Sequence, residues 1–271
     1  ALMKIAHFHK KNGDIVEFAN YLEKYDTVYR SKIFSFSKID PYDYNANEII
    51  DGGTGFNIQK KLPDEIESLD PDYSIYSNCD FSLQLFSRGC VRKCEFCIVH
   101  EKEGFLKPIK PMKLNPKGKY IVVMDNNFFA NPQWKFAIDW LIEQNQPVEF
   151  LGVDVRSITD EQIFSLKKIQ HKKQIKIAWD NPKENLIPKI KKMIEIIPKY
   201  KLMCYVLIGF NSTPDEDLYR VQELKNIGID PFVMPFNKEN NYQKDFARWV
   251  NHKAIFKTVD FSKYKKKEEK K

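Results

Sequence analysis

Apolar residues in the later two thirds of the chain recur in short runs separated by amphipathic stretches. The runs have the length and β-branched content of buried strands, whereas the stretches between them have apolar residues at helical spacing. The predicted strands are Ser82–Ser87, Tyr120–Asp125, Val148–Val153, Ile175–Trp179, Met203–Ile208 and Pro231–Pro235. The predicted helices are Pro132–Gln144, Thr159–His171, Asn185–Ile197 and Pro214–Asn226. Repeated strand–helix units predict an α/β fold with a parallel sheet, and six in series predict a partial (β/α)6, TIM-like barrel.

Local signals support the helix boundaries. Thr159 and Gln162 have the spacing of a capping box, in which each side chain satisfies a backbone amide of the other residue. Thr213 places a capping hydroxyl directly before Pro214, which is favoured at the first helical position. Gly228 supplies a stop after the last predicted helix.

The first 78 residues predict a separate, small α/β unit of Rossmann-like character. We expect a helix over Ala1–Lys11, strands over Ile15–Phe18 and Val28–Phe36, a glycine-rich turn at Gly52–Gly55 and a helical turn over Pro63–Leu69. The predicted organisation is therefore a small unit over 1–78, the barrel over 79–240, and a C-terminal helical extension with a basic tail over 241–271.

Composition places the chain among globular proteins, with 42% hydrophobic and 30% charged residues in 271. No apolar run is long enough to cross a bilayer, and the first residues lack the pattern of a signal peptide, so we expect a soluble, cytoplasmic protein. Residues 1–78 carry 9 Lys and Arg against 13 Asp and Glu, whereas the rest carries 35 against 24. This basic excess suits an anionic substrate. The tail over 263–271 is interpreted as a solvated end and not a nucleic-acid contact, because aromatic residues are not interleaved with its lysines.

Three of the five cysteines lie within eight residues, as Cys90, Cys94 and Cys97. The spacing is C-x3-C-x2-C, directly after the first predicted barrel strand, and it is not that of a secreted disulfide framework. Zinc normally takes four ligands, and His100 lies close enough in sequence to be the fourth, so a zinc site remains an alternative. Three thiolates on a four-iron cluster would instead leave one iron free to bind a further molecule. Arg88, Arg92 and Lys93 suit such an anionic cluster.

The triplet, with the aromatic Phe96 before its last cysteine, resembles the radical S-adenosylmethionine (SAM) superfamily. The resemblance extends over about residues 81–237 and implies one 4Fe-4S cluster held by Cys90, Cys94 and Cys97, whose fourth iron is chelated by SAM. It also implies reductive cleavage of SAM to a 5′-deoxyadenosyl radical that abstracts hydrogen from a substrate. A low-potential donor such as flavodoxin or ferredoxin would supply the electron.

Further positions follow from that resemblance one at a time. Phe96 would lie by the adenine, and Asp125, Asn126 and Asn127 occupy the place of the family's glycine-rich segment, which contacts the SAM amino group. The remaining expected contacts are Arg156 to the SAM carboxylate, Asp180 to the ribose, and Gly209 against the adenine. Each is expected at the carboxyl end of a strand, where barrel active sites assemble. The alternative to these contacts is a purely structural role: a turn residue for the Asp and Asn positions, a surface ion pair for Arg156 and a tight strand exit for Gly209.

The nearest resemblance within the superfamily is to the proteins that carry a cobalamin-binding domain, here with a shortened N-terminal unit. Cobalamin itself is not expected, because the D-x-H-x-x-G signature is missing around His7 and His9, which are interpreted as residues of the helix surface. Cys79 and Cys204 are interpreted as core residues, so a single cluster is expected. The substrate is not identified by the sequence. The alternatives are a cobalamin-dependent radical methyltransferase, a non-catalytic zinc or RNA-binding module using His100, and an electron carrier with a fourth protein ligand such as Cys79.

Overall fold

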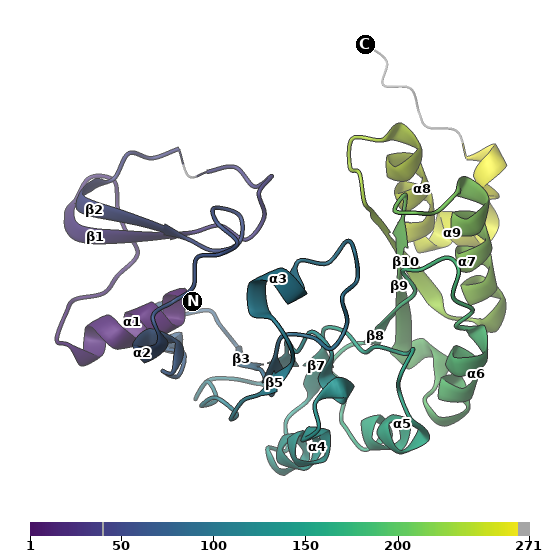
Figure 1. The fold of residues 1–271 in the computed structure, drawn as a ribbon, viewed down its shortest axis with the longest axis horizontal. Helices are drawn as coiled ribbons and strands as arrows, with labels where there is room; N and C mark the ends of the chain where they lie inside the picture. The colour runs from purple at the N-terminus through teal and green to yellow at the C-terminus, as the bar shows by residue number, and fades with distance from the viewer. Residues whose placement is uncertain (40, 265–271) are drawn as a thin grey trace. The chain divides into compact units, whose positions relative to one another are not determined.

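The computed structural model describes residues 1–39 and 41–264, and the chain divides into two compact units (Figure 1). The first unit comprises residues 1–81 and 111–118, and the second comprises 82–110 and the chain from Lys119 onward. The first unit thus recruits a short segment from beyond the cysteine motif, which the expected boundary at residue 78 did not include. Most of the basic tail, residues 265–271, lies outside the described residues.

The second unit is built on two three-stranded sheets with orders β3-β6-β7 and β8-β9-β10. The strands are β3 (Phe81–Gln84), β6 (Tyr120–Val123), β7 (Val148–Phe150), β8 (Ile175–Ala178), β9 (Leu202–Ile208) and β10 (Asp230–Pro235). Pairing is parallel between β6 and β7, and β9 is parallel to both β8 and β10. Isolated parallel bridges, including Val153 to Ile177, join the two sheets. The described strands form a mixed α/β unit with parallel sheets and no closed barrel.

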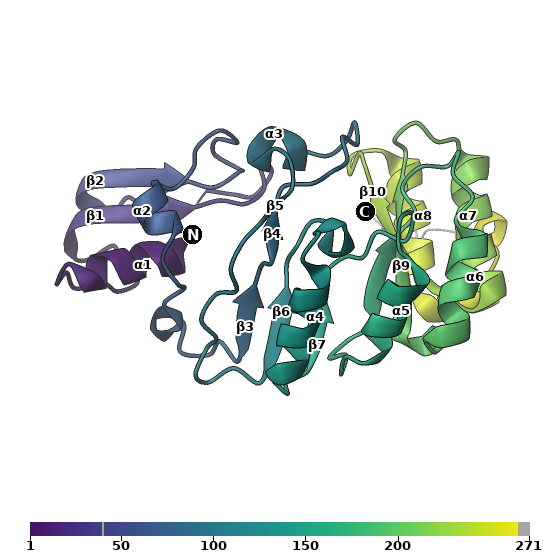
Figure 2. The ribbon, with the colours of Figure 1, turned by 60° about the horizontal axis from the view of Figure 1, so that its bottom comes forward.

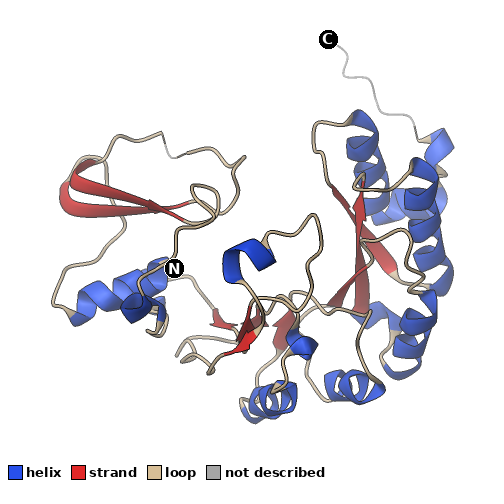
Figure 3. Ribbon diagram, viewed as in Figure 1, coloured by secondary structure: helices blue, strands red, loops and turns tan. Residues whose placement is uncertain are grey.

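Helices alternate with these strands along the chain and lie along one side of them (Figures 2 and 3). They are α4 (Trp134–Glu143), α5 (Asp160–Lys167), α6 (Ile187–Ile196) and α7 (Pro214–Ile227). The sheet residues alternate accordingly: Ile175 and Ile177 of β8 are fully buried, whereas Lys176 between them is partly exposed. After β10, α8 (Asn241–Asn251) and α9 (Lys253–Thr258) bury a cluster of aromatic rings around Trp249, which completes this core.

The six strands predicted for the second unit are all present, but several end earlier than expected. Ser82–Ser87 is divided: β3 stops at Gln84, and Ser87 belongs instead to β4 (Ser87–Arg88), which pairs antiparallel with β5 (Lys107–Pro108). The physical reason is the carboxylate of Asp125, which accepts the backbone N–H of Phe86 at 3.0 Å and draws it out of the sheet ladder. The Asp125 side chain therefore takes the place of a neighbouring strand as the hydrogen-bond partner of the Phe86 N–H.

The helix-terminal signals are confirmed. The Thr159–Gln162 capping box is present at the start of α5, and Thr213 and Glu216 form a second one at the start of α7. Gly228 ends α7 in the left-handed conformation at φ 81°, which only glycine adopts without strain.

The first unit contains α1 (Leu2–Lys11), the parallel strands β1 (Lys24–Ser31) and β2 (Asn45–Gly52), and α2 (Asp64–Glu67). The predicted strand Ile15–Phe18 is wrong, because this segment has no strand partner and Ile15 is 94% exposed. The predicted strand Val28–Phe36 starts earlier, at Lys24, and ends at Ser31, where its partner strand β2 ends at Gly52.

None of the described helices combines the length and the apolar character that a membrane span requires. The longest of the described helices, α7, has 14 residues and carries charged side chains through most of its length.

Thr213→Ala should lower the free energy of unfolding by about 1 kcal/mol, because it removes the capping hydroxyl that accepts the Glu216 N–H at the start of α7. Urea unfolding at neutral pH measures the change. Thr258→Ala is the matched control, since Thr258 is exposed in α9 and its hydroxyl bonds only to the carbonyl of Ala254. An equal loss in both variants would contradict the capping role.

Candidate functional site

The cysteine motif forms a loop whose ends are held together by the β4–β5 pair. Ser87 lies opposite Pro108 and Arg88 lies opposite Lys107, and the loop between them contains the three cysteines and the short helix α3 (Val99–Glu103). The N–H of Cys90 donates to the carbonyl of Gly104, which closes the loop at its base. The sequence between the two strands is therefore presented as one compact structure at the end of β3.

Gly89 is required at the entrance to this loop. Its φ is +78°, and a Cβ atom at this position would lie 2.4 Å from the carbonyl oxygen of Phe105. Any larger residue would therefore separate the two sides of the loop immediately before the first cysteine.

Glu103, at the end of α3, fixes the loop to the end of β6. Its carboxylate accepts the N–H of Gly89 at 2.8 Å and Asn126 Nδ2 at 2.9 Å, and it pairs with Arg88 at 3.4 Å. Asn126 Nδ2 also lies 3.5 Å from the carbonyl of Gly89. The amide predicted to contact a cofactor thus has a structural role in holding the loop.

The thiols of Cys90 and Cys94 are half-buried, that of Cys97 is exposed, and none forms a disulfide. The sulfur of Cys90 accepts the N–H of Arg92 at 3.4 Å, and the N–H of Cys97 donates to the carbonyl of Cys94 at 2.9 Å. Although Cys97 as a residue is exposed, partial desolvation of its sulfur raises the pKa of the thiol, and the neighbouring Cys94, Cys90 and Asp180 raise it further. The three sulfurs therefore share one electrostatic environment.

Asp154, just beyond β7, joins the cysteine loop to the strand ends. Its side chain is 8% exposed, and it accepts hydrogen bonds from Arg92 Nε at 2.5 Å, Arg156 Nε at 2.7 Å and Asn127 Nδ2 at 3.2 Å. Arg92 belongs to the cysteine loop, whereas Asn127 follows β6. A single carboxylate therefore holds groups from three segments.

The charges of Asp154, Arg92 and Arg156 stabilise one another. Burial disfavours the charged form of Asp154, but hydrogen bonds and positive charge from Arg156 and Arg92 outweigh it and hold the pKa of Asp154 below its usual value. The pKa of Arg156 is raised despite burial, because Asp154 and the hydrogen-bonded sulfur of Cys94 favour its cationic form. Arg156 thus places a positive charge beside one of the three thiols.

Asp125 lies at the start of the cysteine loop, and its carboxylate accepts hydrogen bonds from neighbouring protein groups. Its carboxylate is buried and accepts the N–H of Phe86 and, at 2.6 Å, the hydroxyl of Ser87. Burial raises the pKa of Asp125, although these hydrogen bonds oppose the effect. The structure gives this predicted cofactor contact a supporting role at the start of the cysteine loop.

Two other predicted residues retain unsatisfied oxygens. Asn127 Oδ1 and Asp180 Oδ1 are buried, and neither has a hydrogen-bond partner among the described residues. Burial raises the pKa of Asp180, whereas the charge of Arg156 lowers it. Buried polar atoms without partners are costly, so both oxygens are candidates to contact a bound group.

Phe96 packs against the segment that follows β9. Its ring lies 5.5 Å from that of Phe210, which lies 4.9 Å from Phe236. Gly209 precedes Phe210 with a φ of +75°, and a Cβ there would lie 1.9 Å from Nε2 of Gln243. Packing against α8 therefore accounts for this glycine, and the contact with Phe210 brings Phe96 to the end of β9.

A buried ion pair fixes the end of β8. Arg220 and Asp217 of α7 are 0% and 1% exposed in their side chains and meet at 2.6 Å. Arg220 also donates to the carbonyls of Trp179 and Asp180 at 2.8 and 3.2 Å. Trp179 itself is fully buried and belongs to the core. The carbonyl bonds set the backbone that carries the Asp180 carboxylate.

The described residues include no group of three or more His, Cys, Asp or Glu side chains placed to hold a metal ion. The zinc set of Cys90, Cys94, Cys97 and His100 is accordingly not gathered around one point; the His100 ring instead packs on Phe105 at 4.8 Å. The same finding covers Cys90, Cys94 and Cys97, which the described structure does not place as a metal-binding group. Near them, Arg156 carries a positive charge beside Cys94, and Asn127 and Asp180 each keep a buried oxygen without a partner.

The predicted site residues therefore fall into two groups. The loop cysteines, Asn127, Arg156 and Asp180 share one network of contacts and charges, whereas Asp125, Asn126 and Gly209 are engaged in holding the surrounding structure. Cys204 is fully buried as expected, and burial raises its pKa, but Cys79 is only half-buried.

Two residues of this network were missed by sequence reasoning, Asp154 and Glu103. Asp154 had a usable signal, since it follows a predicted strand directly and stands two residues before Arg156. Glu103 had none, because its partners Gly89 and Asn126 are distant in sequence.

Comparison with known proteins finds no matching family model and no significant match to a curated protein.

Asp154→Asn should lower the free energy of unfolding at pH 7 by about 2 kcal/mol, because two partly accessible guanidinium groups lose their shared carboxylate. The folded-state pKa of Asp154 is lowered, so its contribution is complete above about pH 4 and is lost as the pH falls through the folded pKa. The difference between wild type and variant, measured by urea unfolding, should shrink below about pH 4.

Asp160→Asn is the control for that experiment. Asp160 forms an exposed ion pair with Lys192, both side chains being more than half exposed, so its loss should change stability less. Equal losses for the two variants, or a difference that grows on acidification, would contradict the role given to Asp154.

Proposed function

We propose that this protein is a radical SAM enzyme that holds one 4Fe-4S cluster on Cys90, Cys94 and Cys97. One observation carries the proposal: the three thiols lie on one closed loop at the end of β3, and Arg92 of that loop is tied through Asp154 to Arg156, beside Cys94. This arrangement combines three thiolate ligands with a fixed positive charge, as an anionic cluster requires.

The fold supports the proposal through its strand order. The sheets β3-β6-β7 and β8-β9-β10 follow the chain order, and parallel bridges join them, as in a partial (β/α)6 barrel. Helices α4 to α7 intervene between successive strands. In such an arrangement the carboxyl ends of the strands share one face, which is where barrel enzymes place their active sites.

The chain's own residues have separable tasks in this proposal. Cys90, Cys94 and Cys97 would hold the cluster, and Phe96 would offer its ring to the adenine. Arg156 would pair with the SAM carboxylate, a task for which a guanidinium is suited. Asn127 and Asp180 would direct their unsatisfied oxygens to the amino group and the ribose. When bound, the cluster supplies the electron that cleaves SAM and so provides a carbon radical for hydrogen abstraction.

Supporting residues would keep these groups in place. Asp154 fixes the orientation of Arg92 and Arg156, Glu103 and Asn126 close the loop, and Asp125 anchors its first strand. Enzymes that use such a cofactor rely on the protein mainly for orientation and exclusion of water, and these contacts serve the first purpose.

The alternatives receive less support from the described residues. The zinc module would need His100 as its fourth ligand, and the His100 ring packs on Phe105 instead. An electron carrier would need a fourth protein ligand on the cluster. The first unit, with its two-stranded sheet, gives no reason to add cobalamin or methyl transfer. A cytoplasmic setting, with a low-potential flavodoxin or ferredoxin as donor, completes the proposal, and the basic excess beyond residue 78 favours an anionic substrate.

Protein purified without oxygen should be brown, with absorbance near 400 nm and about four irons per chain. Replacing Cys90, Cys94 or Cys97 with Ala should remove the iron, because each thiolate is a ligand. Cys79→Ala and Cys204→Ala serve as controls and should retain it. With dithionite and SAM, the wild-type protein should release 5′-deoxyadenosine.

Three results would count against the proposal. A colourless protein with one zinc would favour the zinc module, and loss of the cluster in Cys79→Ala would favour the electron carrier. An intact, reduced cluster that leaves SAM uncleaved would remove the enzymatic assignment.

Asp180→Asn should weaken SAM binding about 10- to 100-fold, because the charged acceptor for a hydroxyl pair is replaced by a neutral amide of equal size. Iron content should stay unchanged, since Asp180 is not assigned as a ligand. Asp139→Asn on the exposed face of α4 is the control and should bind SAM normally. Unchanged SAM affinity in Asp180→Asn would reject the ribose contact.

A further inference from the structure

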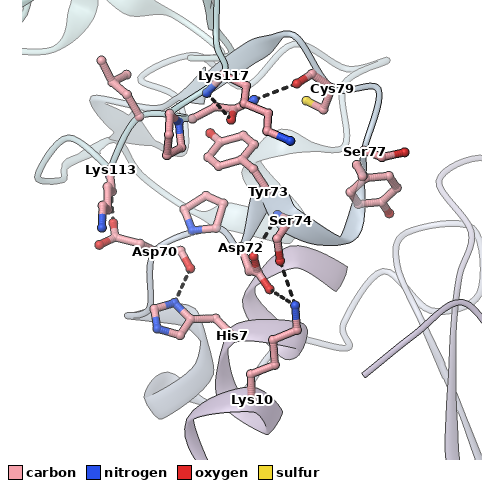
Figure 4. A pocket seen from close by; sticks show the side chains of 15 residues that line it. His7, Lys10, Asp70, Asp72, Tyr73, Ser74, Ser77, Cys79, Lys113 and Lys117 are labelled. Atoms are coloured by element: carbon pink, nitrogen blue, oxygen red, sulfur yellow. Dashed lines mark hydrogen bonds and ion pairs between the residues drawn. The ribbon is translucent and has the colours of Figure 1, made fainter. Parts of the chain in front are cut away.

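The first unit contains a cavity of about 490 Å³, apart from the cysteine loop (Figure 4). All of its lining residues belong to this unit, and they come from α1, from residues 70–79 and from residues 113–117. The volume lies within the range of small-molecule sites, about 300–1,000 Å³.

Hydrogen bonds between the three segments fix the walls of this cavity. The N–H of Asp72 donates to the carbonyl of Met3 in α1, and the N–H of Lys113 donates to the Asp70 carboxylate at 2.9 Å. Asn115 is 5% exposed and donates to the carbonyl of Cys79 at 2.8 Å. The cavity is therefore formed by ordered backbone and does not depend on a ligand to assemble it.

The positive groups of the cavity exceed its available negative groups. Asp72 is already paired with Lys10 at 2.8 Å and accepts the N–H of Ser74. These contacts outweigh burial and lower the pKa of Asp72, so its charge is committed. Asp70 accepts only the neutral backbone N–H of Lys113, so the lining has three lysines against two aspartates. Among the described residues, the ammonium groups of Lys113 and Lys117 lie within ion-pair distance of no carboxylate.

Apolar rings complete the lining. Figure 4 shows the side chain of Tyr73 in the middle of the lining residues, with Lys117 on one side and His7 and Lys10 on the other. Tyr73 is 7% exposed, and Tyr76 and two prolines, Pro71 and Pro116, also line the cavity. Such walls suit the face of a planar ring, while the lysines suit an anionic group.

We propose that this cavity binds a nucleoside phosphate, with the phosphates at Lys113 and Lys117 and the planar base against the wall formed by the tyrosines and prolines. The site is additional to the cluster and SAM site and does not depend on the function proposed above. His7 donates from Nδ1 to the carbonyl of Asp70 at 2.8 Å, so its ring is held at the edge of the same cavity.

Isothermal titration of the full chain with ADP tests this site. Wild type should bind ADP with an affinity that falls as salt is raised, and adenosine and pyrophosphate should each bind at least tenfold more weakly. Lys113→Gln with Lys117→Gln should weaken ADP binding at least tenfold. The matched control, Lys60→Gln with Lys61→Gln, removes two exposed lysines of the same unit outside the cavity and should stay within twofold.

A second variant guards against a folding artefact. Ser77→Glu adds a negative charge to an exposed lining residue and should also weaken ADP binding at least tenfold. Iron-free protein should bind ADP as well as the iron-loaded form, so this result is separable from failure of the cluster assignment. The site is rejected if ADP does not bind at millimolar concentration, if both lining variants bind it normally, or if adenosine or pyrophosphate alone binds as tightly.

Discussion

The carboxylate of Asp154 is the interaction on which the candidate site depends. It is almost fully buried and takes hydrogen bonds from Arg92, Arg156 and Asn127, which come from three separate segments. A buried carboxylate in contact with two guanidinium groups is stable only while all partners remain, because each charge would otherwise be left without compensation in a poorly solvated place. The cysteine loop is therefore held to the strand ends by a contact that does not tolerate partial loss.

The position of Arg156 links this support to chemistry. The same guanidinium that pairs with Asp154 also interacts with the sulfur of Cys94 and with the charge of Asp180. Arg156 therefore connects the support of the loop to the candidate site residues. The unsatisfied oxygens of Asn127 and Asp180 show where the protein has polar capacity left for a further group. The carboxylates of Asp125 and Glu103, by contrast, already accept hydrogen bonds from other groups of the protein.

The sequence allowed the strand–helix order to be predicted because β-branched runs and capping pairs such as Thr159–Gln162 are local signals. It failed where a distant side chain competes with the ladder, as Asp125 does at Phe86. It also failed where apolar residues remain exposed, as at Ile15. The need for glycine at position 209 has a cause that the sequence does not show, because a side chain there would meet Gln243, which only tertiary packing brings close. The return of residues 111–118 to the first unit, and hence the cavity, has no local signature.

The electron paramagnetic resonance spectrum of the reduced, anaerobic protein shows whether one iron of the proposed cluster is left for SAM. We expect a 4Fe-4S signal in the absence of SAM that changes when SAM is added, because the cosubstrate would bind the open iron. A reduced cluster whose spectrum is the same with and without saturating SAM, or a protein that binds no iron at all, would contradict it.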